Sequence, residues 1–171
     1  MKHLLISSAA AVAALFATPA FAQDTAANDM SGARAAIIVG TGGNKVVDFD
    51  GQTIGFEVGY DWNLGETAVA GVAVQYDTDL GSGIFDANGT AVIGRVGGKV
   101  GTSGLVYVGG GYTRVSEGVT PFDDGIDGVR GLIGVEFGVG QNLTLKLEQR
   151  YSNYELGLHL HQTVAGIGFR F

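Results

Sequence analysis

The residues that most directly suggest catalysis are a serine and two histidines near the end of the chain. Ser152 comes two residues after Arg150, and His159 and His161 follow. A serine nucleophile needs a neighbouring base, and arginine cannot be that base because it does not lose its proton in proteins. Ser152 and His161 also fall on opposite faces of the strand pattern described below. We therefore expect no catalytic residues and predict that the protein is not an enzyme.

Two short segments resemble a metal-binding motif and a phosphate-binding motif, but neither motif is complete. Asp48 and Asp50 begin a calcium-loop pattern, but Gly59 stands where the closing glutamate belongs. The glycine-rich segment 40–45 lacks the spacing of a phosphate-binding loop, and no helical pattern follows it. The chain has no cysteine, which excludes thiolate metal sites and disulfides. We predict no metal and no cofactor.

Charged and apolar residues alternate along most of the chain. In segment 54–62 one face carries isoleucine, phenylalanine, valine, tyrosine and tryptophan, and the other carries glycine, glutamate and aspartate. This period of two residues is typical of a strand between two different environments. The triple glycine 109–111 hides the phase of one strand. The alternation predicts a charged face made of Arg34, Glu57, Asp61, Asp77, Arg95, Lys99, Arg114, Arg130, Glu136, Lys146, Glu148, Arg150 and Arg170.

The strands that could position these side chains are separated by regular turn signals. We predict eight strands at residues 33–41, 53–62, 67–77, 90–100, 105–115, 128–139, 143–153 and 160–171. Short links alternate with longer ones, except that the link after the seventh strand is also short. This layout predicts an all-β fold, an eight-stranded antiparallel transmembrane β-barrel. Val135 and Leu145 are then expected to face lipid.

The aromatic residues decide which face points inward. A soluble barrel keeps apolar side chains inside, whereas a barrel in lipid reverses this because hydrocarbon cannot solvate charge. With the first strand running outward, aromatic residues collect at both rims, as in the two girdles of membrane barrels. The predicted girdle consists of Tyr60, Trp62, Tyr76, Tyr107, Phe137 and Tyr151.

The first residues resemble an export signal. Lys2 and His3 precede an apolar run that is too short to span a membrane, and segment 20–22 is a small-x-small cleavage site. We predict a signal peptide at 1–22, a short periplasmic lead-in at 23–32 and the barrel at 33–171. Without Lys2, 9 basic residues face 17 acidic ones, so nucleic acid is not an expected partner.

The last strand carries the clearest family resemblance. Ile167, Phe169 and Phe171 alternate up to the final residue, which resembles the C-terminal strand that bacterial outer-membrane barrels use as an assembly signal. Segment 145–154 resembles the penultimate strand of the small eight-stranded family of opacity-protein and OmpA/OmpX type. It also looks like a segment of outer-membrane lipid A deacylases, but Arg150 stands in place of their histidine. The small-barrel resemblance implies a Gram-negative surface protein in the cell outer membrane, with roles in envelope integrity, adhesion or host contact.

The same resemblance implies partners: outer-membrane lipid and lipopolysaccharide, the barrel-assembly machinery and an unknown surface ligand. An eight-stranded interior is filled by side chains, so we predict a structural or surface-interaction protein with a filled lumen. A small or gated porin-like ion channel lined by the basic excess is the alternative, and a lipid-modifying enzyme comes after it. Acidic residues gather in the predicted loops, where they form a solvated rim or bind divalent cations beside lipopolysaccharide.

Overall fold

A computed structural model of the protein describes residues 29–44, 49–80, 88–116 and 125–171. The predicted signal peptide, most of the predicted lead-in and parts of three predicted loops lie outside the described residues. Within the described part of the chain, no helix is long and apolar enough to cross a membrane.

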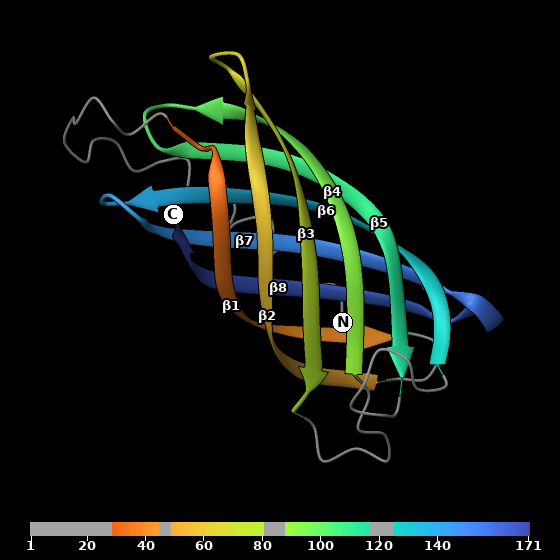
Figure 1. The fold of residues 1–171 in the computed structure, drawn as a ribbon. Coiled ribbons are helices and arrows are strands. Elements are labelled where there is room, and N and C mark those ends of the chain that lie inside the picture. The colour runs from red at the N-terminus through yellow and green to blue at the C-terminus, as the bar shows by residue number, and fades with distance from the viewer. Residues whose placement is uncertain (1–28, 45–48, 81–87, 117–124) are drawn as a thin grey trace, which may run out of the picture.

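Eight strands form one closed antiparallel barrel (Figure 1). They are β1 (Gly32–Asn44), β2 (Phe49–Leu64), β3 (Ala68–Asp79), β4 (Asn88–Val100), β5 (Gly104–Ser116), β6 (Gly125–Val139), β7 (Leu143–Tyr154) and β8 (His159–Arg170). Each strand pairs with the next in the chain, and β8 pairs with β1. The predicted fold class is therefore confirmed, and the closure leaves no unpaired edge.

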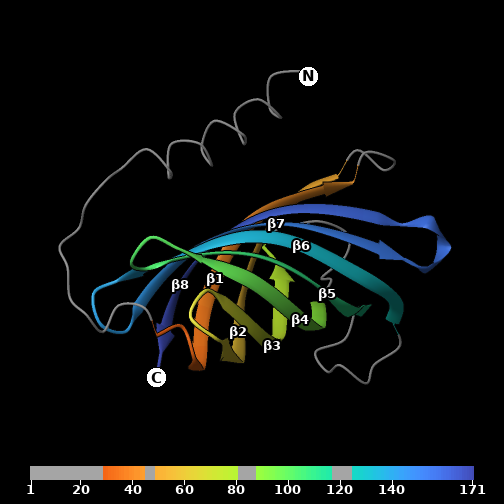
Figure 2. The ribbon, with the colours of Figure 1, turned by 90° about the horizontal axis from the view of Figure 1, so that it is seen from above.

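Three tight turns join strands at the end of the barrel that holds the C-terminus. Gly65, Gly101 and Gly140 occupy them with φ angles of 76°, 65° and 81°, a region where residues with a Cβ are strained. Figure 2 shows the end of β8 beside the start of β1, as their pairing requires. Short turns on the side of the termini are the arrangement of outer-membrane barrels, so we call this the periplasmic end and the opposite one the outer end.

Several strands extend beyond their predicted limits at the outer end. β2 begins at Phe49 rather than at residue 53, and its pairing with β1 continues to Asn44 opposite Phe49. The sequence prediction followed the alternation of apolar and polar residues, which stops where the apolar band stops. Backbone pairing does not need that alternation and continues past it. The short link after β7 contains a single 3₁₀ turn, η1 (Glu155–Gly157).

The distribution of side chains in this barrel is the reverse of that in a soluble protein, with apolar side chains outside and charged ones inside. Ile37, Val92 and Val129 are 66%, 56% and 64% exposed on the outside, whereas Asp61 and Arg150 have no exposed surface. Water would make both arrangements costly, because it would leave large apolar side chains exposed and charged ones desolvated. A hydrocarbon environment around the wall favours the exposed apolar side chains and excludes charged ones from the outside, so the charged side chains lie in the lumen.

Candidate functional site

The inward face of the barrel carries the candidate site, a network of buried ion pairs that we call the lumen network. Its members are at most 8% exposed. They are Arg34, Glu57, Asp61, Asp77, Arg95, Arg130, Glu136, Lys146, Glu148, Arg150 and Arg170. The predicted Lys99 also points inward and lies half-buried at the turn end of β4.

Two predicted residues of β5 lie on the opposite face from the one expected. Tyr107, predicted for the outward girdle, is 1% exposed inside the lumen. Arg114, predicted for the lumen, lies outside and pairs with Asp127 at 3.1 Å. Both predictions are wrong for one reason: the three glycines 109–111 have no side chains to mark the alternation, and the predicted phase was shifted by one residue.

At the periplasmic end two carboxylates are held by three arginines. Asp61 lies 3.1 Å from Arg34, 2.5 Å from Arg95 and 2.9 Å from Arg170. Glu136 is 3.0 Å from Arg95 and 2.6 Å from Arg170. Arg95 therefore bridges both carboxylates, and its guanidinium stacks 4.6 Å from the centre of the Tyr107 ring.

The middle of the lumen is built around two glutamates. Glu57 pairs with Arg34 and with Lys146, whose Nζ lies 2.7 Å from it. Lys146 also donates to Glu148 at 2.9 Å, and Arg150 lies 2.6 Å from the same glutamate. The lysine thus links the two carboxylates, and the Tyr107 hydroxyl donates a further bond of 2.7 Å to Glu148.

Towards the outer end, Asp77 is the carboxylate that holds the arginines of the network. Arg130 lies 3.1 Å from Asp77, and Arg150 lies 3.6 Å from it. Arg130 also donates to the Ser152 hydroxyl at 3.0 Å and to the Gln75 amide oxygen at 3.2 Å. The ion-paired residues therefore form one continuous network along the lumen, from Arg170 near the periplasmic end to Arg130 near the outer end.

Glycines make room for these large inward side chains. A Cβ at Gly71 would lie 1.9 Å from Oδ1 of Asp61, and one at Gly134 would lie 2.6 Å from the Tyr107 hydroxyl. Neither position tolerates a side chain while its neighbour keeps its place. Gly71 of β3 and Gly134 of β6 are therefore explained by the bulk of the inward side chains next to them.

The end of the predicted lead-in packs against the barrel. Met30 is 4% exposed, and Arg170 donates to its carbonyl oxygen. Asp29 accepts hydrogen bonds from Ser31 and, at 2.7 Å, from the Asn63 amide. The Ser31 hydrogen bonds, helped by Asn63, lower the pKa of Asp29 to about 2, so the carboxylate stays charged through the physiological range. Sequence reasoning missed this contact because segment 29–32 has no strand pattern.

The predicted rim aromatics other than Tyr107 project outward. Tyr60 and Trp62 are 44% and 48% exposed near the periplasmic end, and Phe137 is half-buried there. At the outer end Tyr76 donates to Asn88 at 2.9 Å, and the Tyr151 hydroxyl lies 3.1 Å from Nδ1 of His159.

The structure adds Tyr112 to the outer rim, where its hydroxyl donates to Asp127. The predicted assembly residues Ile167, Phe169 and Phe171 are exposed on the outward face, at 59%, 48% and 73%.

The serine and histidine considered for catalysis lie on opposite sides of the wall. Ser152 has no exposed surface and binds Arg130 inside the lumen. His161 is exposed outside, where its ring lies 4.7 Å from the Tyr151 ring. No group of three or more histidine, cysteine, aspartate or glutamate side chains in the described ranges is arranged to hold a metal ion.

A family model for the outer membrane protein beta-barrel domain matches residues 8–171. The chain belongs to this family. It is therefore an outer-membrane β-barrel protein, and its eight-stranded fold is that of the family's small members. The resemblance seen in the sequence is confirmed. None of the curated proteins compared with the chain matches it.

Solved structures share the fold at low sequence identity. Neisserial surface protein A is 15% identical, with 81% of this chain and 96% of that chain covered and a TM-score of 0.57. Ail, the attachment invasion locus protein of Yersinia pestis, is 14% identical over 83% and 100% of the two chains, with the same TM-score. The outer membrane enzyme PagL is 12% identical over 81% and 99%, again at 0.57. A surface protein, an attachment protein and an enzyme thus share this barrel, so the fold alone does not decide the function.

Proposed function

We propose that the protein is a structural and surface-interaction component of the outer membrane whose lumen is filled and does not conduct. The observation that carries this proposal is the lumen network, an unbroken set of buried ion pairs from one end of the barrel to the other. The barrel wall is then a rigid support, and contact with lipid or a surface ligand takes place on its outside and at its outer rim.

The energetics of the network support a closed lumen. Each charge in it is desolvated and lies close to at least one partner of opposite sign, so opening a path requires separating pairs inside the wall. An eight-stranded barrel has an interior just wide enough for side chains. The small relatives with this fold include a surface protein and an attachment protein, which agrees with a role outside the lumen.

A small or gated ion channel is the second candidate, because the inward charges do not balance. Six cations and five anions form the lumen network, and the inward Lys99 adds a further positive charge. Such an excess favours anions along any path that opens. This candidate requires the ion pairs to rearrange.

A lipid-modifying enzyme has less support. The hydroxyl of Ser152 and the imidazole of His161 are separated by the barrel wall, so they cannot form a nucleophile–base pair within hydrogen-bond reach. We further propose that residues 1–22 direct export, that lipopolysaccharide and lipid surround the apolar band, and that β8 is the segment recognised by the assembly machinery.

Single-channel recording of the refolded mature protein in planar bilayers tests the proposed function. Heat-dependent gel migration confirms that each sample is folded, and Arg95→Ala is compared with Arg114→Ala as a control outside the lumen. A silent bilayer for the wild type supports the filled lumen. Steady conductance that changes with Arg95→Ala but not with Arg114→Ala would replace the proposal with the channel.

A further inference from the structure

The outward face of β7 and β8 carries a polar cluster at the outer end of an otherwise apolar band. The Tyr151 hydroxyl lies 3.1 Å from Nδ1 of His159, and the Tyr151 ring lies 6.0 Å from the ring of His159 and 4.7 Å from that of His161. Two residues further along each strand towards the periplasmic end, the Thr163 hydroxyl donates to the Gln149 amide oxygen at 2.7 Å. These side chains lie on the outside of the wall and take no part in the lumen network.

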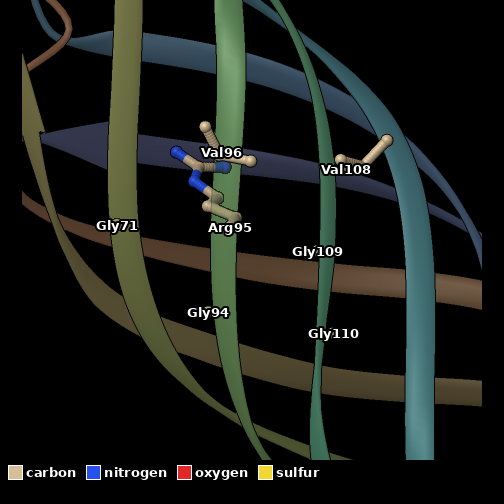
Figure 3. A pocket seen from close by; sticks show the side chains of 7 residues that line it. All are labelled: Gly71, Gly94, Arg95, Val96, Val108, Gly109 and Gly110. Carbon is tan, nitrogen blue, oxygen red and sulfur yellow. The ribbon is translucent and has the colours of Figure 1, made fainter. Parts of the chain in front are cut away.

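A shallow depression lies on β3 to β5 of the same outward surface, separated from the cluster by β6. Gly94, Gly110 and Gly131 are neighbours across β4, β5 and β6 in the strand register. The hollow has a volume of about 410 Å³ and is lined by Gly71 of β3, residues 94–96 of β4 and residues 108–110 of β5 (Figure 3). The Arg95 side chain is only 3% exposed, so it adds little polar surface. Gly131 follows Gly110 in the row, on β6, next to the hollow. Val96 and Val108 are half-exposed, at 51% and 52%. The hollow is therefore an apolar recess in the surface that faces lipid.

The protein's own packing does not require glycine in this row. A Cβ would meet nothing nearer than 3.9 Å at Gly94 and 3.4 Å at Gly110, and nothing within 4 Å at Gly131. This differs from Gly71 and Gly134 in the lumen, where a Cβ would clash. The recess is open to an occupant from outside the protein.

The register connects the recess to the polar cluster. Gly131 is paired with Tyr151, and Tyr151 is paired with His161. Strands of such barrels are inclined by roughly 35–45° to the barrel axis, so a row across the strands also changes its depth in the membrane. Gly94 lies near the middle of β4, whereas His161 lies close to the outer end of β8. The row therefore leads from the apolar band to the outer head-group region.

We propose that this face binds one phosphate-bearing lipid of the outer leaflet. Its phosphate accepts hydrogen bonds from the Tyr151–His159–His161 cluster, and one acyl chain lies in the glycine recess. Imidazole and phenol groups donate to phosphate oxygens, and the recess increases the contact with the chain. The inference rests on membership of the outer-membrane family and is independent of whether the lumen conducts.

Native mass spectrometry of the folded protein, exchanged into detergent with dimyristoyl phosphatidic acid or dimyristoylglycerol, tests this site. Wild type is expected to retain one phosphatidic acid and to bind the phosphate-free lipid about fivefold less, the effect of losing one hydrogen bond. His161→Ala and Gly131→Leu are each expected to reduce phosphatidic acid binding by a similar factor of about five. Gly98→Leu is the matched control, because Gly98 is an exposed glycine of β4 outside the row.

The outcomes separate a specific site from the general lipid shell. Equal retention of both lipids would overturn the head-group contact, and equal effects of Gly131→Leu and Gly98→Leu would overturn the recess. Heat-dependent gel migration verifies folding of each variant. If Gly131→Leu does not fold, Gly131→Ala replaces it, because a Cβ has free space there.

Discussion

At the scale of single residues, the buried ion pairs of the lumen and the exposed ion pair on the outside should contribute differently to stability. Arg95 is buried between Asp61 and Glu136, and replacing it with alanine would leave two carboxylates with fewer partners inside the lumen. The outward Arg114–Asp127 pair has side chains 27% and 42% exposed, so solvent screens it. The same substitution therefore has different consequences on the two sides of the wall.

We expect Arg95→Ala to lower the free energy of unfolding by roughly 3–5 kcal/mol, the cost of leaving buried charge uncompensated. Arg114→Ala should cost about 0–1 kcal/mol. Urea-induced unfolding in lipid vesicles, followed by tryptophan fluorescence of Trp62, measures both. Similar losses for the two variants would contradict the assignment of Arg95 to a desolvated network.

At the scale of elements, the phase of β5 can be tested with two tyrosines of opposite orientation. Tyr107 donates a hydrogen bond to Glu148 inside the lumen, and Tyr112 donates one to Asp127 at the exposed rim. Tyr107→Phe should cost about 1.5–3 kcal/mol, because a buried charged acceptor loses its donor. Tyr112→Phe should cost less than about 1 kcal/mol, because water replaces the bond. A larger loss of stability for Tyr112→Phe than for Tyr107→Phe in the same unfolding assay would mean that β5 has the phase predicted from the sequence.

The outward face of β7 can be tested with a charge. Leu145 is 43% exposed, and Leu145→Arg should cost roughly 2–4 kcal/mol if the site lies near the bilayer midplane. Asn153→Arg, on the same face at the outer end, should cost about 0–1 kcal/mol. Val135 is less suitable: it lies on the outward face but is only 7% exposed. Folding yield and stability in vesicles give the comparison, and no penalty at Leu145 would count against the lipid-facing assignment.

Also at the scale of elements, the last residue, Phe171, completes the pairing of the C-terminal end of the chain with β1. The backbone N–H of Phe171 donates to the Ala33 carbonyl at 2.9 Å, and its ring lies 5.8 Å from that of Phe169. We expect deletion of Phe171 to reduce the amount of protein assembled in the outer membrane of cells, as the family resemblance implies. The control is Phe171→Trp, which keeps an aromatic end. Normal surface levels after the deletion would show that assembly does not depend on this residue.

At the scale of the whole molecule, the closure between β1 and β8 holds the lumen together. Ala35 and Phe169 are opposite each other in that register, and the chain contains no native cysteine. The double variant Ala35→Cys/Phe169→Cys should form a disulfide on mild oxidation, because opposed strand residues lie within bonding distance. Non-reducing gel electrophoresis after unfolding detects the cross-link.

The control for this cross-link uses a residue on the far side of β8. Leu143 pairs with Phe169, so Ala35 and Leu143 are separated by a whole strand, about 10 Å. Ala35→Cys/Leu143→Cys should remain reduced. A cross-link in the control alone would mean that β8 does not lie between β1 and β7.

Local pattern alone determined most of the architecture. The number of strands, their order and the grouping of charges such as Asp61 and Arg150 on one face follow from alternation between turn signals, and the aromatic residues at the rims indicate that this face points inward. Alternation is a property of consecutive residues, so it can be followed without knowing the partners of a strand. It failed in β5, where the glycines 109–111 carry no side chain to report the face.

Only the tertiary structure decided which groups meet. Lys146 pairs with Glu57, which is 89 residues away in the sequence, and Met30 lies against Arg170 across the ends of the chain. The glycine row that leads from the recess to Tyr151 likewise exists only because separate strands align their glycines in one register. Each of these contacts depends on closing eight strands into a ring, and closure is a long-range event that no local period encodes.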